Sequence, residues 1–268
     1  MKIIHFSDSH AGAPPAGWKA FTDKRIAGTL NYLLFRKKQH NQEILRELCV
    51  KILDLKPDLV VCTGDITSTG QPEEFQTALE FVAPLIGNPS FRFLYVPGNH
   101  DKYVNDGECR EALHSAFAKI NGENLNLDDM PLKIRIEDCE FILVDETTPT
   151  NIFSSCGYLD EKSSYAIEGW CREKNGLPKI LVGHFPLIDP HPILRLRKRL
   201  WGQRKIVKCL SEGLLDLCLC GHIHKPYVDV DARGRGVACA GSVTISHSFT
   251  MIEYSPGDGN FTFHEIRI

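Results

Sequence analysis

Five short motifs in this chain contain the residue types that bind metal ions, and they follow one another along most of its length. They are Asp8-Ser9-His10, Gly64-Asp65, Gly98-Asn99-His100-Asp101, Gly183-His184 and Gly221-His222-Ile223-His224. Carboxylates, imidazoles and amide oxygens are hard or borderline ligands that suit divalent metal ions. A single residue of this kind would mean little, but the ordered set predicts one shared metal site.

Each motif directly follows a short apolar run that is typical of a buried strand. The runs span residues 3–6, 59–62, 93–96, 180–182 and 217–220. Ligands of α/β proteins bind at the edge where the carboxyl ends of the strands meet, so we expect all five loops to lie at one edge. The spacing of Asp8 and His10 repeats in His222 and His224, and an extended segment would point both members of such a pair the same way.

Glycines precede Asp65, Asn99, His184 and His222. We expect these glycines to adopt the unusual backbone angles of sharp turns and to permit close approach of an ion. Two simpler interpretations remain open at this point. Asp65 could cap a helix after Gly64, and Asn99 and Asp101 could be ordinary turn residues.

Between and after the motifs, apolar spacing predicts further elements. Helices are expected near residues 44–55, from Pro72 to about residue 86, and over 108–120. Two hairpin strands, 132–137 and 140–145, are expected to join at Asp138-Cys139, and strands follow at 227–231, 236–240 and 261–266. This order predicts an α/β (α+β) protein with a two-layered sheet core covered by helices.

The composition excludes several broad classes. A net charge of -3 over 268 residues gives no footprint of nucleic-acid binding, so no nucleic-acid partner is expected. No stretch approaches the ~18 apolar residues of a membrane span, and a strand-like N-terminus leaves no visible secretory signal. Ten scattered cysteines, several of them inside apolar runs, favour a reduced cytoplasmic protein over a disulfide framework.

The ordered motif set resembles the calcineurin-like metallophosphoesterases, over residues 8–224. The resemblance implies a β-sandwich flanked by helices, with residues 1–268 forming a single domain. It implies that one metal ion is held by Asp8, His10, Asp65 and His224, and a second by Asp65, Asn99, His184 and His222, with Asp65 bridging. It also implies that His100 is the catalytic histidine and that Asp101 orients it.

Two ions about 3.5–4 Å apart can clamp the attacking and leaving oxygens of a phosphoryl group. Asp8, Asp65 and a bridging hydroxide would remove three of the four positive charges, so the site would stay cationic, as a phosphate requires. His100 as an imidazolium could stabilise phosphoryl charge or protonate the leaving oxygen. We expect two divalent ions, with Mn favoured over Fe or Zn.

Residues 21–40 and 191–208 combine basic side chains with Leu, Ile, Phe and Trp. They are either solvated basic helices or amphipathic helices beside the site that contact an anionic membrane or a lipid-like substrate. Similar insertions occur in the UDP-diacylglucosamine pyrophosphatases of lipid A synthesis. The best-known branch of that group, however, has Arg where this chain has His100.

The sequence therefore predicts a dinuclear metal phosphohydrolase in the cytoplasm, with peripheral membrane contact if the basic segments bind lipid. The expected substrate is a phosphodiester or a pyrophosphate, for instance a lipid-linked nucleotide such as UDP-diacylglucosamine. The alternative enzyme is a cyclic-nucleotide phosphodiesterase. The non-enzyme alternative is a metal-free scaffold protein with the same fold. The complete set of ligand residues disfavours it.

Overall fold

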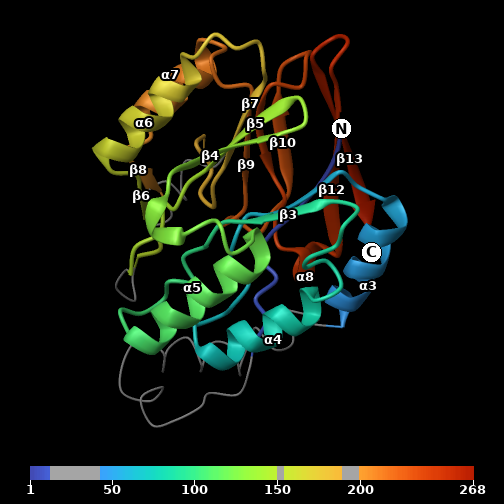
Figure 1. Ribbon diagram of the computed structural model, residues 1–268, viewed down its shortest axis with the longest axis vertical. Coiled ribbons are helices and arrows are strands. Elements are labelled where there is room, and N and C mark those ends of the chain that lie inside the picture. The colour runs from blue at the N-terminus through green and yellow to red at the C-terminus, as the bar shows by residue number, and fades with distance from the viewer. Residues whose placement is uncertain (13–42, 150–153, 189–198) are drawn as a thin grey trace.

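Two β-sheets form the centre of the protein (Figure 1). The computed structural model describes residues 1–12, 43–149, 154–188 and 199–268. The first sheet has the strand order β13-β12-β1-β2-β3, and the second has the order β10-β11-β9-β7-β5-β4. A separate ribbon pairs β6 with β8. This arrangement confirms the predicted α/β class with two sheet layers.

The strands of the first sheet are β1 Lys2–Phe6, β2 Leu59–Cys62, β3 Arg92–Tyr95, β12 Ser248–Ser255 and β13 Asn260–Arg267. Those of the second are β4 Leu132–Ile136, β5 Cys139–Leu143, β7 Lys179–Val182, β9 Leu217–Cys220, β10 Tyr227–Val230 and β11 Gly236–Cys239. The ribbon consists of β6 Gly157–Tyr158 and β8 Leu200–Trp201. The described helices are α3 Ile44–Leu55, α4 Pro72–Val82, α5 Gly107–Asn121, α6 Glu161–Cys171, α7 Arg204–Ser211 and α8 Val243–Ser246, with a short 3₁₀ turn at Leu127–Asp129.

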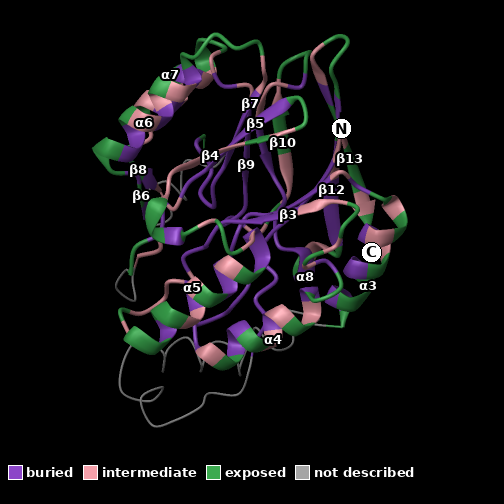
Figure 2. Ribbon diagram, viewed as in Figure 1, coloured by how far each residue is buried: buried purple, intermediate pink, exposed green. Residues whose placement is uncertain are grey.

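Successive side chains of the central strands point to opposite faces of their sheet, one toward the space between the sheets and the next toward the helices. Val61, Phe141 and Leu219 are among those that pack between the two sheets. The opposite face of the first sheet packs against α3, α4 and α5, and that of the second against α6 and α7. Both faces of the central strands are therefore buried (Figure 2), which is why they are continuous apolar runs instead of alternating ones.

The parallel strands bring the motif loops together. β1, β2 and β3 run parallel in the first sheet, and β7 and β9 run parallel in the second. The five predicted strands that precede the motifs are all confirmed. They belong to two sheets, however, so the motifs meet where the carboxyl-end edges of both sheets lie against each other.

The three predicted helices are present, with small differences at their ends. α4 ends at Val82, and Leu85 is buried in the turn beyond it. The hairpin turns at Glu137-Asp138, because Glu137 adopts a positive φ of 48° and β5 already begins at Cys139. β12 and α6 had no counterpart in the prediction.

Residues 21–40 lie outside the described part of the chain, as do residues 191–198. In the described remainder of the second basic segment, α7 is amphipathic, and its buried residues Ile206 and Cys209 pack in the core beneath it. Lys205 and Lys208 lie near Glu168 and Glu212. For α7, these contacts favour a helix that covers the core over one that inserts in lipid. Among the described residues, no helix is both long and apolar enough to cross a membrane.

The inter-sheet core gives the first prediction. Ile180 is fully buried between the sheets, whereas Ile245 on α8 is 43% exposed. Replacing Ile180 with Ala should lower the free energy of unfolding by ~2–5 kcal/mol, because it leaves a cavity. Ile245→Ala should stay within ~0.5 kcal/mol. Urea unfolding of both variants measures the difference, and equal losses would contradict the assigned core.

Candidate metal centre

The predicted ligands have an unusual backbone conformation. Eight described residues other than glycine have a positive φ, and five of these are predicted ligands: Asp8, His10, Asp65, His222 and His224. Their φ values lie between 46° and 70°. This left-handed conformation is uncommon outside glycine and costs of order 1–3 kcal/mol per residue. Asp8 and His10 are thus left-handed rather than extended, and the predicted extended geometry is wrong.

The neighbouring glycines mainly provide space. Among the four glycines before the ligands, only Gly64 has a positive φ, at 95°. A Cβ at Gly98 would lie 2.1 Å from Asp65 Oδ1, and one at Gly221 would lie 2.4 Å from Asp8 Oδ2. For Gly98 and Gly221 the expectation of unusual backbone angles is therefore wrong. Their missing side chains let ligand carboxylates pack directly against the backbone.

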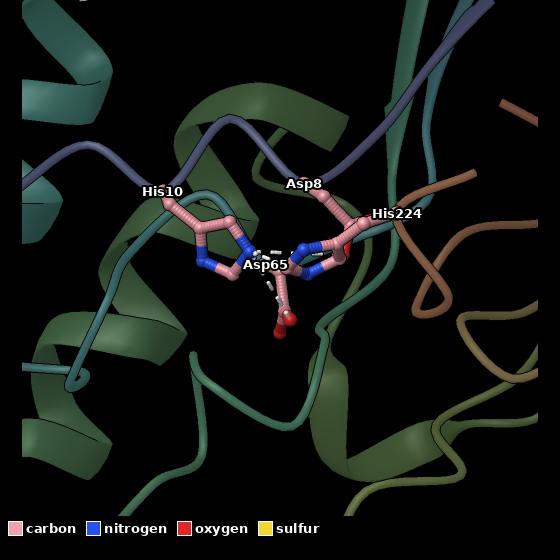
Figure 3. Close-up of side chains that lie close together, drawn as sticks. All are labelled: Asp8, His10, Asp65 and His224. Carbon is pink, nitrogen blue, oxygen red and sulfur yellow. Dashed lines mark hydrogen bonds and ion pairs between the residues drawn. The ribbon is translucent and has the colours of Figure 1, made fainter. Parts of the chain in front are cut away.

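Four predicted ligands form a tight group (Figure 3). Ligand atoms of Asp8, His10, Asp65 and His224 all lie within 4.8 Å of one another. The Nε2 atoms of His10 and His224 are 3.0 Å apart, and His224 Nε2 is 3.2 Å from Asp8 Oδ1. Two ligand atoms that lie at right angles, each about 2.1 Å from an ion, are about 3.0 Å apart. The spacing therefore fits ligands of one ion.

Backbone contacts fix this group in place. Past the ends of β1 and β2, the amides of Asp8 and His10 donate to the carbonyls of Gly64 and Asp65 at 2.9 Å. The Nδ1 atom of His10 lies 3.2 Å from the carbonyl of Thr67, so its Nε2 is left for the group. This is the outer contact by which proteins commonly orient a metal-binding histidine.

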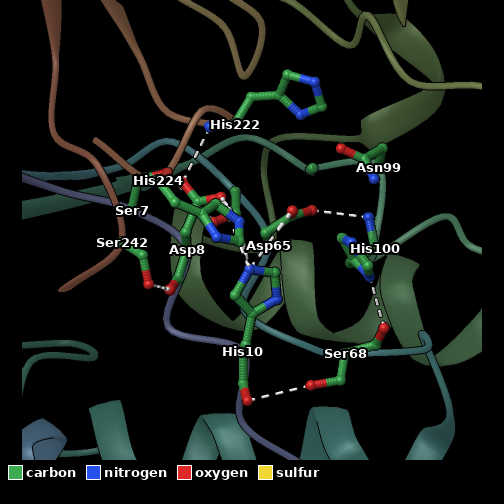
Figure 4. A network of polar contacts seen from close by, with 12 residues as sticks. Ser7, Asp8, His10, Asp65, Ser68, Asn99, His100, His222, His224 and Ser242 are labelled. Atoms are coloured by element: carbon green, nitrogen blue, oxygen red, sulfur yellow. Dashed lines mark hydrogen bonds and ion pairs between the residues drawn. The ribbon is translucent and has the colours of Figure 1, made fainter. Parts of the chain in front are cut away.

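The other predicted ligands surround Asp65 from the second sheet and from β3. His184 Nε2 lies 3.4 Å from Asp65 Oδ2 and 3.2 Å from Asn99 Oδ1, while its Nδ1 is 2.6 Å from the carbonyl of Thr63. His222 packs its ring against that of His184, with centroids 5.2 Å apart. Its ring is turned away from the first group (Figure 4), so His222 and His224 do not point the same way, contrary to prediction.

Two buried carboxylate oxygens indicate what the centre could hold. Asp8 Oδ1 and Asp65 Oδ2 are buried, and imidazole nitrogens face both: His224 Nε2 lies 3.2 Å from Asp8 Oδ1. Asp65 Oδ2 lies 3.9 Å from His10 Nε2 and 3.4 Å from His184 Nε2, between the two histidine sets. A buried carboxylate is costly unless positive charge faces it, and either a protonated imidazole or a bound cation can supply that charge. The donor set of carboxylate, imidazole and amide oxygen thus fits divalent metal ions.

The charges of the centre are strongly coupled. Burial would raise the pKa of Asp65, but the imidazoles of His184, His100 and His10 outweigh it and hold that pKa well below its usual value. Burial likewise opposes the charged form of His184, yet the carboxylate of Asp65 raises the His184 pKa to about 10. Without metal, His184 is therefore protonated and forms an ion pair with Asp65. To bind a metal ion, the His184 imidazole must be neutral.

Asp101 does not orient His100 as predicted, because the ring of His100 contacts Ser68 instead (Figure 4). The Nδ1 atom of His100 is 2.6 Å from the carbonyl of Ser68. Asp101 is buried and accepts hydrogen bonds from the amides of Ile66, Thr67 and Gly98 and from the hydroxyls of Thr67 and Tyr95. Its role is thus to tie together the loops that follow β2 and β3, which is close to the turn-residue interpretation.

Asp65 does not cap a helix, and Asn99 lies beside His184. No helix begins within a few residues of Asp65, so the helix-cap alternative does not apply. Asp65 Oδ1 accepts the amide of His100 at 2.7 Å, which leaves Oδ2 for the histidines. His100 itself is half-exposed, stacks on Tyr103 and meets the edge of His10, with ring centroids 5.4 Å and 4.9 Å away.

The sequence interpretation missed Glu146. This glutamate is buried, and its Oε2 accepts the amides of His184 and Phe185 at 3.0 and 2.8 Å. Burial raises its pKa to about 7, although both hydrogen bonds act in the opposite direction. The available signal was its position, because Glu146 follows β5 just as each ligand motif follows a strand. Ser68 and Tyr95 were also missed, and their types alone give no such signal.

The chain is similar to known proteins. The family model described as calcineurin-like phosphoesterase matches residues 1–226. A probable glycerophosphodiester phosphodiesterase, GpdQ of Arcobacter nitrofigilis, is 39% identical over 184 residues, which cover 66% of this chain and 60% of that protein. A component of the nuclease SbcCD of Staphylococcus epidermidis is 23% identical over 270 residues, covering 96% of this chain and 64% of that protein. The chain thus spans about three fifths of these relatives.

A solved structure shares the fold. A dimetal phosphatase from Danio rerio superimposes with a TM-score of 0.64 at 16% identity, covering 94% of this chain and 91% of that one. At this identity the likeness concerns the arrangement of sheets and helices alone.

The raised pKa of His184 gives a prediction about metal uptake. At pH 7.5 this imidazole is protonated, and it must lose its proton to bind a metal, so uptake should release about one proton at this residue. Metal affinity should then rise with pH, by up to about tenfold per unit. Calorimetric titration of chelator-treated protein with Mn²⁺ in two buffers of different ionisation enthalpy measures this release. A heat that is independent of the buffer would contradict it.

Proposed function

Because this chain belongs to the calcineurin-like phosphoesterase family, we propose that it is a phosphodiesterase that works with two divalent metal ions at the candidate centre. The observation that carries this proposal is that imidazole nitrogens from both sheets meet around two buried carboxylate oxygens, Asp8 Oδ1 and Asp65 Oδ2. A metal-free scaffold has no need to bury so many carboxylates and imidazoles at one place, which speaks against the non-enzyme alternative.

The proposed ligand assignment follows the two groups. Asp8, His10, Asp65 and His224 would hold one ion, and Asp65, Asn99, His184 and His222 the other. Asp65 Oδ2 supports a bridging role because it lies between His10 and His184. When bound, such ions activate water and polarise phosphoryl oxygens. Mixed imidazole and carboxylate ligation favours Mn, Fe or Zn over Mg or Ca, and we propose Mn.

His100 is proposed to handle the proton of the leaving oxygen. The carbonyl of Ser68 can only accept a hydrogen bond, so Nδ1 of His100 carries a hydrogen and Nε2 is the atom that exchanges protons. The stack on Tyr103 and the edge contact with His10 fix the ring plane. Since His100 is half-exposed beside buried ligands, a substrate can reach it from solvent while its phosphoryl group lies at the centre.

A phosphodiester is the proposed substrate class. One relative is named a phosphodiesterase and another a nuclease, and both names refer to cleavage of phosphodiester bonds. The lipid-linked pyrophosphate and the membrane surface remain untested predictions, and the described part of residues 191–208 gives them no support. Cyclic nucleotides are phosphodiesters too, so that alternative stays within the proposed class.

His100→Asn should keep both metal ions and lose about 10²–10⁴-fold in turnover, since the residue fills no ligand position but transfers a proton. Asp65→Asn should impair binding of both ions. His114→Asn is the matched control, because His114 lies on α5 and is partly exposed near Asp128. Metal content and steady-state turnover are measured for the three variants and the wild type. Wild-type turnover in His100→Asn would remove the proposed role.

A substrate panel tests the reaction class. With Mn²⁺ present, bis(p-nitrophenyl) phosphate and a glycerophosphodiester should be hydrolysed faster than p-nitrophenyl phosphate, a monoester. A cyclic nucleotide, a single-stranded oligonucleotide and a UDP-linked lipid pyrophosphate complete the panel, the last with and without anionic vesicles. Preference for the monoester would overturn the phosphodiesterase proposal. Preference for the pyrophosphate, increased by vesicles, would restore the lipid-linked interpretation.

A further inference from the structure

Glu146 is a buried carboxylate that no ligand role uses. It follows β5, is 1% exposed, and places Oε2 against the backbone of the turn after β7. The amides of His184 and Phe185 both donate to this single oxygen, at 3.0 and 2.8 Å. Hydrogen bonds to an ionised carboxylate are roughly twice as strong as neutral ones. This side chain therefore holds the peptide from which His184 projects.

The neighbouring strand β9 also holds this turn. The amide of Gly183 donates to the carbonyl of Leu219 at 3.1 Å, and the carbonyl of His184 accepts the amide of Gly221 at 2.9 Å. Beyond the ladder, the amides of His184 and Phe185 find their described acceptor in Glu146. A backbone amide buried without an acceptor would cost about 1–3 kcal/mol. β5 ends at Leu143, so the Glu146 carboxylate accepts the two amides that a longer strand would otherwise have paired.

Gly183 is shaped to this carboxylate. A Cβ at Gly183 would lie 2.8 Å from Glu146 Oε2 and 2.9 Å from Oε1, closer than real Cβ contacts allow. Gly183 has no positive φ, so backbone angles do not demand a glycine there. The glycine before His184 is therefore explained by Glu146, although the two residues are far apart in the chain.

The other oxygen indicates that the contact does more than stabilise the turn. Glu146 Oε1 is buried and has no hydrogen-bond partner among the described residues. Burying an oxygen that has no donor is costly. Nearby positive charge stabilises a buried carboxylate, and His184 and the proposed ions supply such charge.

We propose that Glu146 is a positioning residue for the second metal ion: its carboxylate fixes the turn that aims His184 at Asp65 and Asn99. This inference rests on the proposed dinuclear function. The first group has its own supports, in the contact of His10 with Thr67 and the backbone pairing of β1 with β2, so Glu146 acts on one ion and not on the other.

The test compares metal stoichiometry and affinity in Glu146→Ala and Glu146→Gln. Mn²⁺ is added to chelator-treated protein, free and bound metal are measured by equilibrium dialysis, and electron paramagnetic resonance distinguishes coupled from single ions. Glu146→Ala should bind the second ion about 10–100-fold more weakly, as is usual when an outer partner of a ligand is lost. The coupled signal should give way to a single-ion signal. Glu146→Gln, which keeps an acceptor oxygen, should retain part of the affinity.

Glu140 provides a matched control on the same strand. It is also a buried glutamate with an oxygen that lacks a described hydrogen-bond partner, but it lies at the start of β5, away from the metal centre. Glu140→Ala should bind both ions like the wild type. Gly183→Ala should weaken binding of the second ion in the wild-type background. It should add little to the effect of Glu146→Ala, because both changes disrupt the same contact between Gly183 and Glu146.

The outcomes separate this inference from the proposed function. Two ions bound with wild-type affinity in Glu146→Ala would overturn it, as would equal weakening of both ions, which indicates general damage. Thermal unfolding of the metal-free variants checks that they fold. A wild-type chain that binds fewer than two Mn²⁺ ions would instead contradict the dinuclear proposal itself.

Discussion

The carboxylate of Asp65 is the interaction on which the rest of the centre depends. One of its oxygens accepts the amide of His100, and the other lies in the buried space between His10 and His184. A charged group in that position is tolerated only if opposite charges or a cation face it. Histidines from two different sheets must therefore approach the same atom, at 3.9 and 3.4 Å, which fixes how the sheet edges meet.

The two sheets achieve this approach through backbone contacts that cross between them. His184, which follows a strand of the second sheet, is 2.6 Å from the carbonyl of Thr63 in the first. The amide of His222 donates to Asp8 Oδ2, again from one sheet to the other. The apolar core between the sheets supports these contacts, because Val61, Phe141 and Leu219 pack closely between the two layers.

Strain and polar support balance each other around the centre. Five left-handed ligand residues would favour other conformations if the loops were free. Asp101 accepts three amides and two hydroxyls in the loops around the left-handed Asp65, and Glu146 accepts two amides in the turn of His184. A site that must hold ions in fixed geometry needs this outer support as much as it needs the ligands.

The sequence by itself determined the strands before the motifs, the sheet-and-helix class and the residue types gathered at the site, because buried strands and ligand types leave local patterns. Only the tertiary structure decided that the motifs come from two sheets. It also decided that Asp101 binds loop amides and does not orient His100, and that a side chain at position 183 would collide with Glu146. These facts depend on contacts between segments far apart in the chain. No spacing along the sequence records which carboxylate a distant backbone amide will meet, so such contacts become visible only when the sheets are packed.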